Sequence, residues 1–258
     1  MSPVAAGMAY EVHGGSPHEE RPPLVLIHGA AGNHLFWPPQ LRRLEVTTVF
    51  ALDLPGHGRS AGEGRDCIES YVEDLLRWIG ALRLGPCVLA GHSMGSAVAL
   101  MTALTQADRV AGLILVGAGG RLRVHPLILE KAASEATFVE AVGLIVQAAY
   151  GPHANRRLVE LGRKRMLASR PEVLLHDLKA CDSFDVLERL GEITAPALVL
   201  CGQEDQLTPE KYSRRLGEAM PQAEVQVVPD AGHMLMLEQP AAVADAARRF
   251  LLERFAAR

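Results

Sequence analysis

A serine between two glycines is the first candidate for chemistry in this chain. The segment Gly91-His92-Ser93-Met94-Gly95 follows an apolar, partly β-branched run and precedes small and apolar residues that suit a helix. A strand that turns this sharply into a helix forces its corner residue to positive φ, and side chains two positions to either side would collide. Glycine is therefore needed at both flanks. The serine gains an exposed Oγ beside a helix N-terminus, where N–H groups can face an anion. The pattern predicts a nucleophile elbow, and a structural Gly/Ser turn is the alternative.

A serine hydroxyl needs help to react, because it is a poor nucleophile at neutral pH. A histidine must take its proton, and an acid must orient that histidine. In a parallel sheet both should come from loops at the carboxyl ends of later strands. Asp205 follows the apolar run 197–201, and His233 follows the run 224–228. The order Ser93, Asp205, His233 belongs to one of the three known triad topologies and not to the other two.

Other acids and histidines compete for these roles. The alternative acids are Asp230, Glu204 and Asp185. Asp230 lies only three residues before His233 and is expected to cap its own turn, which favours Asp205. Three histidines next to glycine-rich segments are expected to make structural hydrogen bonds: His28, His57 and His92. Four more are expected at the surface: His18, His125, His153 and His176.

Composition limits the class of protein. The 258 residues are 48% hydrophobic and 22% charged, as in an ordinary globule of one large domain or one domain with an inserted piece. A formal charge of −4 offers no general attraction for nucleic acid or anionic lipid. Four widely spaced cysteines without a C-x-x-C pair favour reduced thiols and a cytoplasmic location. The first residues lack the basic and apolar regions of a signal peptide. No residue set has metal-ligand spacing and no glycine motif of nucleotide binding is present, so neither a metal nor a cofactor is expected.

Hydrophobic patterning predicts the elements that must position these residues. Almost wholly apolar runs predict buried strands, and a weakly alternating run predicts an opening edge strand at residues 8–13. The buried strands are expected at residues 24–27, 47–52, 87–90, 110–116, 197–201 and 224–228. Helical spacing predicts helices at residues 70–84, 94–106, 209–219 and 241–255. This alternation indicates the α/β class, with a mostly parallel twisted sheet covered by helices on both faces.

The alternation stops between residues 121 and 190. Helix-length segments replace strands there, at residues 126–136, 138–150, 154–168 and 173–181. About 70 residues without a strand are long for a loop and natural for a lid. We therefore predict a core made of residues 1–120 and 191–258, and a helical cap of residues 121–190 that lies over Ser93.

Five segments in order resemble those of one known family over nearly the whole chain. They are Leu26-Ile27-His28-Gly29-Ala30, Asp53-Leu54-Pro55-Gly56-His57-Gly58-Arg59-Ser60, Gly91-His92-Ser93-Met94-Gly95, Gly202-Gln203-Glu204-Asp205 and Ala231-Gly232-His233. The chain resembles the α/β-hydrolase fold superfamily, of the cap-bearing, carboxylesterase-like serine hydrolase type. The resemblance implies a cap inserted after the sixth strand. It also implies Ser93 as nucleophile, His233 as general base and then acid, and Asp205 as its orienter. The backbone N–H groups of Ala30 and Met94 would form the oxyanion hole.

The residue type of the nucleophile favours acyl transfer. Serine argues against the alkyl-enzyme route of dehalogenases and epoxide hydrolases, in which a carboxylate attacks. The first interpretation is therefore a carboxylic ester hydrolase that works through an acyl-enzyme. A carbon–carbon bond hydrolase, an enol-lactonase and a cofactor-free perhydrolase share the triad and remain alternatives. A non-catalytic, hydrolase-like ligand-binding protein would be expected to lack a triad member or an elbow glycine, and none is missing.

Apolar residues beside the predicted catalytic positions and aromatic residues of the predicted lid are the candidates for substrate binding. They are Phe36, Trp37, Leu207, Met234, Phe138, Tyr150 and Phe184. The candidates beside the catalytic positions offer no charge to hold an ionic acyl chain, so small to medium uncharged esters are expected as substrates. A small-molecule ester is the one partner predicted, with no nucleic acid and no membrane, for a monomer or homodimer.

Overall fold

A computed structural model describes residues 3–14 and 21–255 of the chain. Residues 1–2, part of the segment in which no signal peptide was expected, lie outside the described residues, and so does His18. Within the described part, no single helix is long and apolar enough to cross a bilayer. One pair of helical segments, Pro126–Ala132 with Glu135–Ala149, meets the length and composition limits only when taken together across a bend of 117°.

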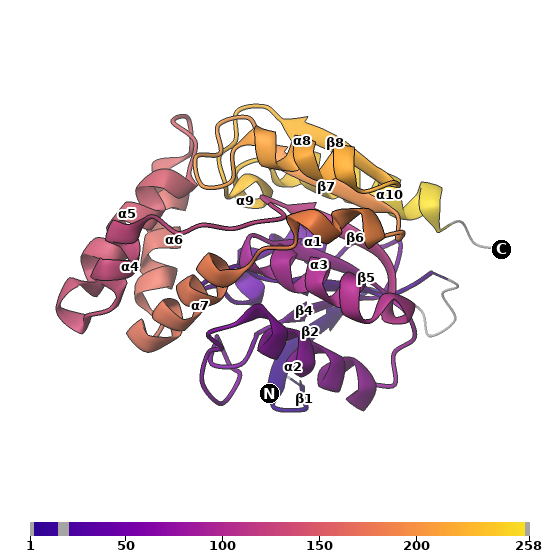
Figure 1. Ribbon diagram of the computed structural model, residues 1–258, viewed down its shortest axis with the longest axis horizontal. Helices are drawn as coiled ribbons and strands as arrows, with labels where there is room; N and C mark the ends of the chain where they lie inside the picture. Colours follow the sequence, from indigo (N-terminus) through magenta and orange to yellow (C-terminus); the bar gives the residue numbers. More distant parts are fainter. Residues whose placement is uncertain (1–2, 15–20, 256–258) are drawn as a thin grey trace.

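An eight-stranded sheet forms the centre of the molecule (Figure 1). Its strand order is β1-β2-β4-β3-β5-β6-β7-β8. The strands are β1 Val4–Ala5, β2 Met8–His13, β3 Leu24–Ile27, β4 Val49–Leu52, β5 Cys87–His92, β6 Val110–Val116, β7 Ala197–Gly202 and β8 Ala223–Val228. The pairs β1·β2 and β2·β4 are antiparallel, and the pairs from β4 to β8 are parallel. The prediction of a mostly parallel sheet is confirmed.

Both faces of the sheet are buried, which explains the apolar runs. Along β3, Leu24 and Leu26 join one hydrophobic cluster while Val25 and Ile27 join the other. Successive strand residues point to opposite faces, so every side chain of a strand that is covered on both sides is buried and apolar residues are favoured throughout. The antiparallel strand β2 lies near the edge, where Val12 is 47% exposed.

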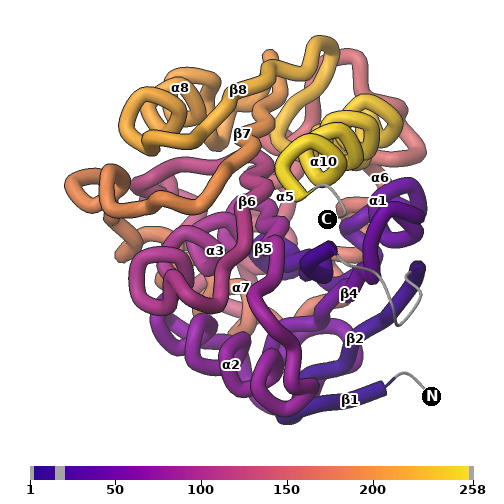
Figure 2. Tube along the Cα trace, turned by 90° about the vertical axis from the view of Figure 1, so that its right-hand side faces the viewer, coloured from indigo at the N-terminus to yellow at the C-terminus, as the bar shows by residue number. Residues whose placement is uncertain are grey.

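Helices cover the two faces (Figure 2). One face carries α2 Ile68–Ala81, α3 Met94–Thr105 and α8 Glu210–Ala219, and the other carries α1 Pro39–Arg42 and α10 Pro240–Arg254. A short helix, α9 Leu235–Glu238, precedes α10. The sequence patterns missed β1, α1 and α9, because elements of two to four residues leave too short a period to recognise.

The segment between β6 and β7 is helical. It contains α4 Pro126–Ala132, α5 Phe138–Ala149, α6 Arg156–Leu167 and α7 Pro171–Ser183, gathered at one end of the sheet in Figure 1. Short 3₁₀ helices complete the described elements: η1 His34–Phe36, η2 Ala107–Arg109, η3 Glu135–Thr137 and η4 Leu187–Glu192. The first helix ends earlier than predicted, since the Thr137 hydroxyl donates to the Lys131 carbonyl at 2.7 Å and draws the chain into η3.

The turn from β5 into α3 is the tightest point of the fold. Ser93 has φ of 52° and ψ of −117°, a backbone conformation that residues other than glycine rarely adopt. A Cβ on Gly91 would overlap the carbonyl oxygen of Gly95, and a Cβ on Gly95 would overlap that of Ile27 at the end of β3. Both glycines are thus required by direct backbone contact.

The elbow contacts predict a selective loss of stability. Gly91→Ala should lower the free energy of unfolding by about 3 kcal/mol, because the clash is with backbone that cannot move aside. Gly80→Ala is the matched control, since a Cβ at Gly80 in α2 has nothing within 4 Å. That change should stabilise the protein by up to about 1 kcal/mol. Urea unfolding of both variants measures the difference, and equal stabilities would contradict the packing argument.

Candidate active site

Three loops bring Ser93, Asp205 and His233 to the carboxyl edge of the sheet. Ser93 follows β5, Asp205 follows β7 and His233 follows β8, and these strands run parallel. The last two loops touch, because the backbone of Glu204 donates to the Ala231 carbonyl at 2.9 Å. Asp205 and His233 are 5% and 3% exposed.

A hydrogen bond joins the acid to the histidine. His233 Nδ1 lies 2.8 Å from Asp205 Oδ2. The Thr208 hydroxyl donates to the same carboxylate oxygen at 2.7 Å, and the N–H groups of Leu207 and Thr208 donate to Oδ1 at 2.9 and 2.8 Å. Because both oxygens are fully engaged, the carboxylate is fixed in the plane that meets the imidazole.

The environment of Asp205 keeps its carboxylate ionised. Burial alone would raise the pKa of Asp205. The charge of His233 and the hydrogen bonds from His233 and Thr208 outweigh burial, so the pKa lies below its ordinary value. An ionised Asp205 accepts the Nδ1–H of His233, which leaves Nε2 as the free face of the ring.

Two neighbours fix the backbone and ring of His233. His92 Nε2 donates to the His233 carbonyl at 3.0 Å. Burial and the neighbouring His233 lower the pKa of His92 to about 3, so His92 is a neutral donor. Gly117, at φ of 56°, lies under the ring: a Cβ there would come within 3.0 Å of His233 Nδ1. The expected structural role of His92 is confirmed by its hydrogen bond.

The other two loop histidines also make the structural bonds expected of them. His28 Nδ1 donates to the Gly29 carbonyl at 2.8 Å, and its Nε2 accepts from Leu54 N–H at 3.0 Å. Burial and the charge of His57 lower the pKa of His28 to about 4, which leaves it neutral. His57 bonds the Pro55 carbonyl and Asp177.

The alternative acids lie elsewhere. Asp185 pairs with Arg121 and Arg123 and accepts from Leu187 N–H. Asp230 is exposed at φ of 51°, and its side chain makes no hydrogen bond to the described residues, so the expected capping role is wrong. Glu204 has a buried Oε2 without a hydrogen-bond partner in the part of the chain that the structure describes.

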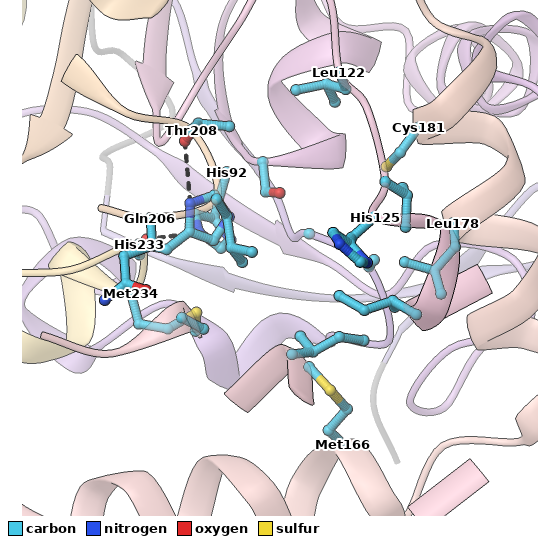
Figure 3. A pocket seen from close by; sticks show the side chains of 18 of the residues that line it. His92, Leu122, His125, Met166, Leu178, Cys181, Gln206, Thr208, His233 and Met234 are labelled. Carbon is cyan, nitrogen blue, oxygen red and sulfur yellow. Dashed lines mark hydrogen bonds between the residues drawn. The ribbon is translucent and has the colours of Figure 1, made fainter. Parts of the chain in front are cut away.

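A cavity of about 220 Å³ opens beside Ser93 and His233 (Figure 3). Its core-side wall includes Gly29, Ala30, Phe36, His92, Gln206, Leu207, Thr208 and Met234. The segment between β6 and β7 supplies the rest of the wall: Leu122, Arg123, Val124, His125, Ile128, Ile145, Ala149, Met166, Leu174, Leu178 and Cys181. Residues from α4, α5, α6 and α7 thus face the same space as the serine.

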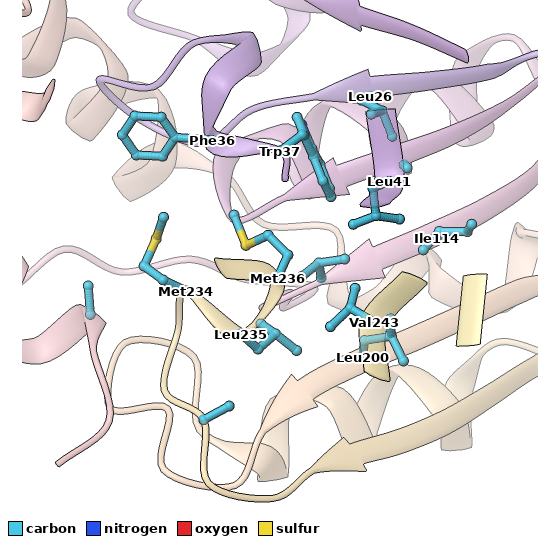
Figure 4. Close-up of a cluster of buried hydrophobic side chains, with 14 of the residues drawn as sticks. Leu26, Phe36, Trp37, Leu41, Ile114, Leu200, Met234, Leu235, Met236 and Val243 are labelled. Atoms are coloured by element: carbon cyan, nitrogen blue, oxygen red, sulfur yellow. The ribbon is translucent and has the colours of Figure 1, made fainter. Parts of the chain in front are cut away.

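Of the four candidate binding residues beside the catalytic positions, three line the cavity and one is buried in the core. Phe36, Leu207 and Met234 line the cavity as predicted. Trp37 is 1% exposed and lies among Leu26 and Leu41 in the core, as Figure 4 shows. Its prediction as a binding residue is corrected, because the chain turns between Phe36 and Trp37 and the two side chains face different surroundings.

The three aromatic residues proposed from the lid segment also need correction. Phe138 is buried in the hydrophobic cluster on one side of the sheet, and Phe184 in the cluster on the other. Tyr150 directs its hydroxyl at α6, where a Cβ on Gly162 would overlap it. These side chains fill the helix–helix and helix–sheet interfaces and lie outside the cavity wall.

Sequence reasoning missed the polar cavity residues. His125 was expected at the surface and is exposed, yet it also lines the cavity and lies across it from His233 in Figure 3. Arg123 contradicts the expectation of a pocket without charge. Its guanidinium is occupied, however, with the Leu122, Asp182 and Phe184 carbonyls and with Asp185.

Two backbone N–H groups are available near the serine. Ala30 lines the cavity, and Met94 is the first residue of α3, next to Ser93. Among the described residues, no acceptor pairs with the N–H of either one. Met94 itself is buried and contributes nothing to the cavity wall. Within the same described part, no three His, Cys, Asp or Glu side chains are grouped to hold a metal ion.

This sheet, with a serine elbow and an acid–histidine pair at its carboxyl edge, is the architecture of an α/β hydrolase. The chain belongs to the Alpha/beta hydrolase family, whose model matches residues 24–246. It is a hydrolase, as its relatives are. The resemblance noted from the five sequence segments is confirmed.

Relatives and solved structures cover nearly the whole chain. A protein of Caulobacter sp. (strain K31), named "Putative carbamate hydrolase RutD", is 31% identical over 97% of this chain and 98% of its own. A thermophilic esterase from Thermogutta terrifontis, solved with malate bound, is 29% identical with a TM-score of 0.84, over 96% of this chain and 94% of its own. The enol-lactonase from Burkholderia xenovorans LB400 has a TM-score of 0.87 at 23% identity, over 95% and 96%, and shows the shared fold.

The hydrogen bond between His233 and Asp205 predicts unequal effects of two isosteric changes. Asp205→Asn should lower kcat by roughly 10³–10⁴-fold, because the imidazole loses its counter-charge and its fixed tautomer. Asp230→Asn, a control in a loop residue whose positive φ asparagine tolerates, should change kcat by less than about threefold. Steady-state kinetics on an activated ester measures both, and the reverse ranking would show that the acid has been misplaced.

Proposed function

We propose that this hydrolase cleaves small to medium uncharged carboxylic esters through an acyl-enzyme, with Ser93, His233 and Asp205 as its catalytic triad. The observation that supports this most directly is the 2.8 Å bond between His233 Nδ1 and Asp205, beside a cavity that Ser93 shares. The elbow geometry at Ser93 supports it independently.

In the first half-reaction, Ser93 Oγ attacks the ester carbonyl carbon and its proton passes to His233 Nε2. Asp205 stabilises the imidazolium that forms. The negative charge on the carbonyl oxygen is met by the N–H groups of Ala30 and Met94, which have no acceptor among the described residues. His233 then gives its proton to the leaving alkoxide, and the acyl group remains on Ser93.

In the second half-reaction, water takes the place of the alcohol. His233 removes a proton as the water oxygen attacks the acyl carbon, and it returns this proton to Ser93 Oγ when the carboxylic acid leaves. Each step uses the same donors, so no additional group is needed. The buried position of His233 and Asp205 keeps water from competing for their hydrogen bonds.

The cavity supports a small, uncharged acyl group. Its volume of about 220 Å³ lies below the range of roughly 300–1,000 Å³ that drug-sized ligands occupy. Most of its side chains are apolar, and the one guanidinium in its wall, of Arg123, is already bonded. A carboxylate on the acyl chain would therefore lose hydration without gaining a free counter-ion.

Carbamate hydrolysis is the second candidate function, and the names of the relatives support it. Two relatives, 31% and 32% identical, are named as carbamate hydrolases. A carbamate presents the same carbonyl to Ser93, and the polar cavity residues His125 and Gln206 could bond its amino group or its oxygens. We further propose a cytoplasmic enzyme, as its cysteine content favours, that is a monomer or homodimer and uses no cofactor.

The nucleophile assignment predicts where a covalent inhibitor binds. An alkyl fluorophosphonate should add once per chain, to Ser93, and Ser93→Ala should both abolish labelling and lower kcat by about 10⁵–10⁶-fold. Ser169→Ala is the control, because among the described residues the Ser169 hydroxyl bonds only the Met166 carbonyl. Peptide mapping by mass spectrometry reads the outcome. Labelling that survives Ser93→Ala rules out this nucleophile.

The cavity size predicts a substrate order. Acetyl and butyryl p-nitrophenyl esters should be hydrolysed at least about tenfold faster than the decanoyl ester, which exceeds the cavity. Matched amides should be much slower because an amine is a poorer leaving group, and EDTA should leave all rates unchanged. Methyl carbamate and a vinylogous diketone complete the panel. A fast carbamate beside a negligible ester rate would favour the second candidate, and fast diketone cleavage would favour a carbon–carbon hydrolase.

A further inference from the structure

A buried carboxylate of α7 has no part in the reaction proposed above. Asp177 is 0% exposed and lies on the apolar side of the helix, beside Leu174 and Leu178. A buried ionised group is costly unless it is paired and hydrogen-bonded. The contacts of Asp177 therefore show what its carboxylate holds in place.

Three elements of the core donate to this one carboxylate. Asp177 Oδ2 accepts from the N–H of Ala31 at 2.7 Å and from His57 Nε2 at 2.8 Å. Asp177 Oδ1 accepts from the Tyr71 hydroxyl at 2.5 Å. Ala31 lies in the loop after β3, His57 in the turn after β4, and Tyr71 in α2.

His57 makes this an ion pair. Its Nδ1 faces the Pro55 carbonyl at 3.0 Å and its Nε2 faces Asp177, and both partners are acceptors. A proton on each ring nitrogen satisfies both acceptors, so this geometry stabilises the positively charged imidazole. Burial opposes this charge, but the Asp177 carboxylate outweighs burial and raises the pKa of His57. A pair held this way resists separation, since either partner alone would be an uncompensated buried charge.

The bond to Ala31 supports a strained residue. Ala31 has φ of 51°, a conformation that an alanine rarely adopts and that persists only where its surroundings enforce it. The loop lies between two cavities: Gly29 and Ala30 line the one beside Ser93, and Ala31 and Gly32 line a second one of about 530 Å³. Ala31 itself is buried, so its N–H needs an acceptor, and the Asp177 carboxylate supplies it.

We infer that Asp177 is a positioning residue for the oxyanion hole: its carboxylate holds Ala31 in the left-handed conformation and thereby fixes the direction of the neighbouring Ala30 N–H. The catalytic consequence rests on the proposed function, whereas the hold on the loop does not. Displacing an oxyanion donor by a fraction of an ångström weakens transition-state binding more than substrate binding.

Two variants separate this role from a merely structural one. Asp177→Asn keeps the shape of the side chain but removes its charge and one of its acceptor oxygens. Tyr71→Phe is the matched control: it removes the donor to Oδ1 and leaves the bonds of Oδ2 to Ala31 and His57 in place. Both substitutions lie in the same buried group of hydrogen bonds. Asp177→Asn is expected to lower the free energy of unfolding more than Tyr71→Phe does, because it also removes the charge that pairs with His57.

The readouts report on the loop and on the oxyanion. In Asp177→Asn, kcat for p-nitrophenyl acetate should fall about 10- to 100-fold with KM changed less than about threefold, and the affinity for n-butylboronic acid should fall by a similar factor. That reagent forms a tetrahedral anionic adduct on serine. Amide exchange of a peptide spanning residues 28–34 should be about tenfold faster in Asp177→Asn, while Tyr71→Phe stays near wild type in every readout.

The outcomes distinguish this inference from the proposed function. An Asp177→Asn protein that folds with unchanged exchange overturns the inference, as does an equal loss in Tyr71→Phe. If the wild type neither cleaves esters nor binds the boronate, the proposed function fails, and loop exchange still decides whether Asp177 holds Ala31. If Asp177→Asn does not fold, residue-resolved exchange of the wild type decides: a protected Ala31 amide supports the hold, and an unprotected one overturns it.

Discussion

One close approach of backbone to backbone governs the rest of the structure. Where β5 turns into α3, Gly91 lies against Gly95, and Gly95 lies against the carbonyl at the end of β3. This contact brings the loop after β3 beside Ser93 and holds Ser93 at positive φ. The acid and histidine loops meet under the same kind of constraint, because a Cβ on Gly202 would overlap the backbone of Ala231 and Gly232. Glycines at the ends of the strands therefore allow the backbone contacts that bring the site together.

Local sequence was enough to locate the groups that now surround Ser93. Each lies within a few residues of an apolar strand, and parallel strands deliver their carboxyl ends to one edge whatever the connections between them. The same reasoning recognised seven of the eight strands, and it predicted a parallel sheet for the six buried ones. Asp230 and Asp205 have equal claims by residue type, and their spacing from His233 favoured Asp205. The 2.8 Å bond between Asp205 and His233 distinguishes the two acids directly.

The cavity wall was harder to predict, for a physical reason. Apolar character predicts burial, but Phe36 and Trp37 are both buried and only one of them faces the cavity. Helical spacing in residues 121–190 identifies apolar stripes without saying whether a stripe meets the sheet, another helix or the cavity, so Phe138, Tyr150 and Phe184 were misplaced. A usable signal was nevertheless present in Asp177, an acid within the apolar stripe of its helix. A buried carboxylate at such a position requires hydrogen-bond donors from the elements packed against it.

The position of Asp177 also bears on how related enzymes can be recombined. The helices between β6 and β7 look exchangeable, because they are contiguous in sequence and gathered at one end of the sheet. Yet α7 contributes an acceptor to the loop after β3, the turn after β4 and α2. A chimera that grafts this segment from another parent inherits matched charges only if that parent also supplies an acid at this position. A crossover at the ends of this segment would separate His57 from its counter-ion, Asp177. Compatible parents are therefore those that keep both members of this buried pair.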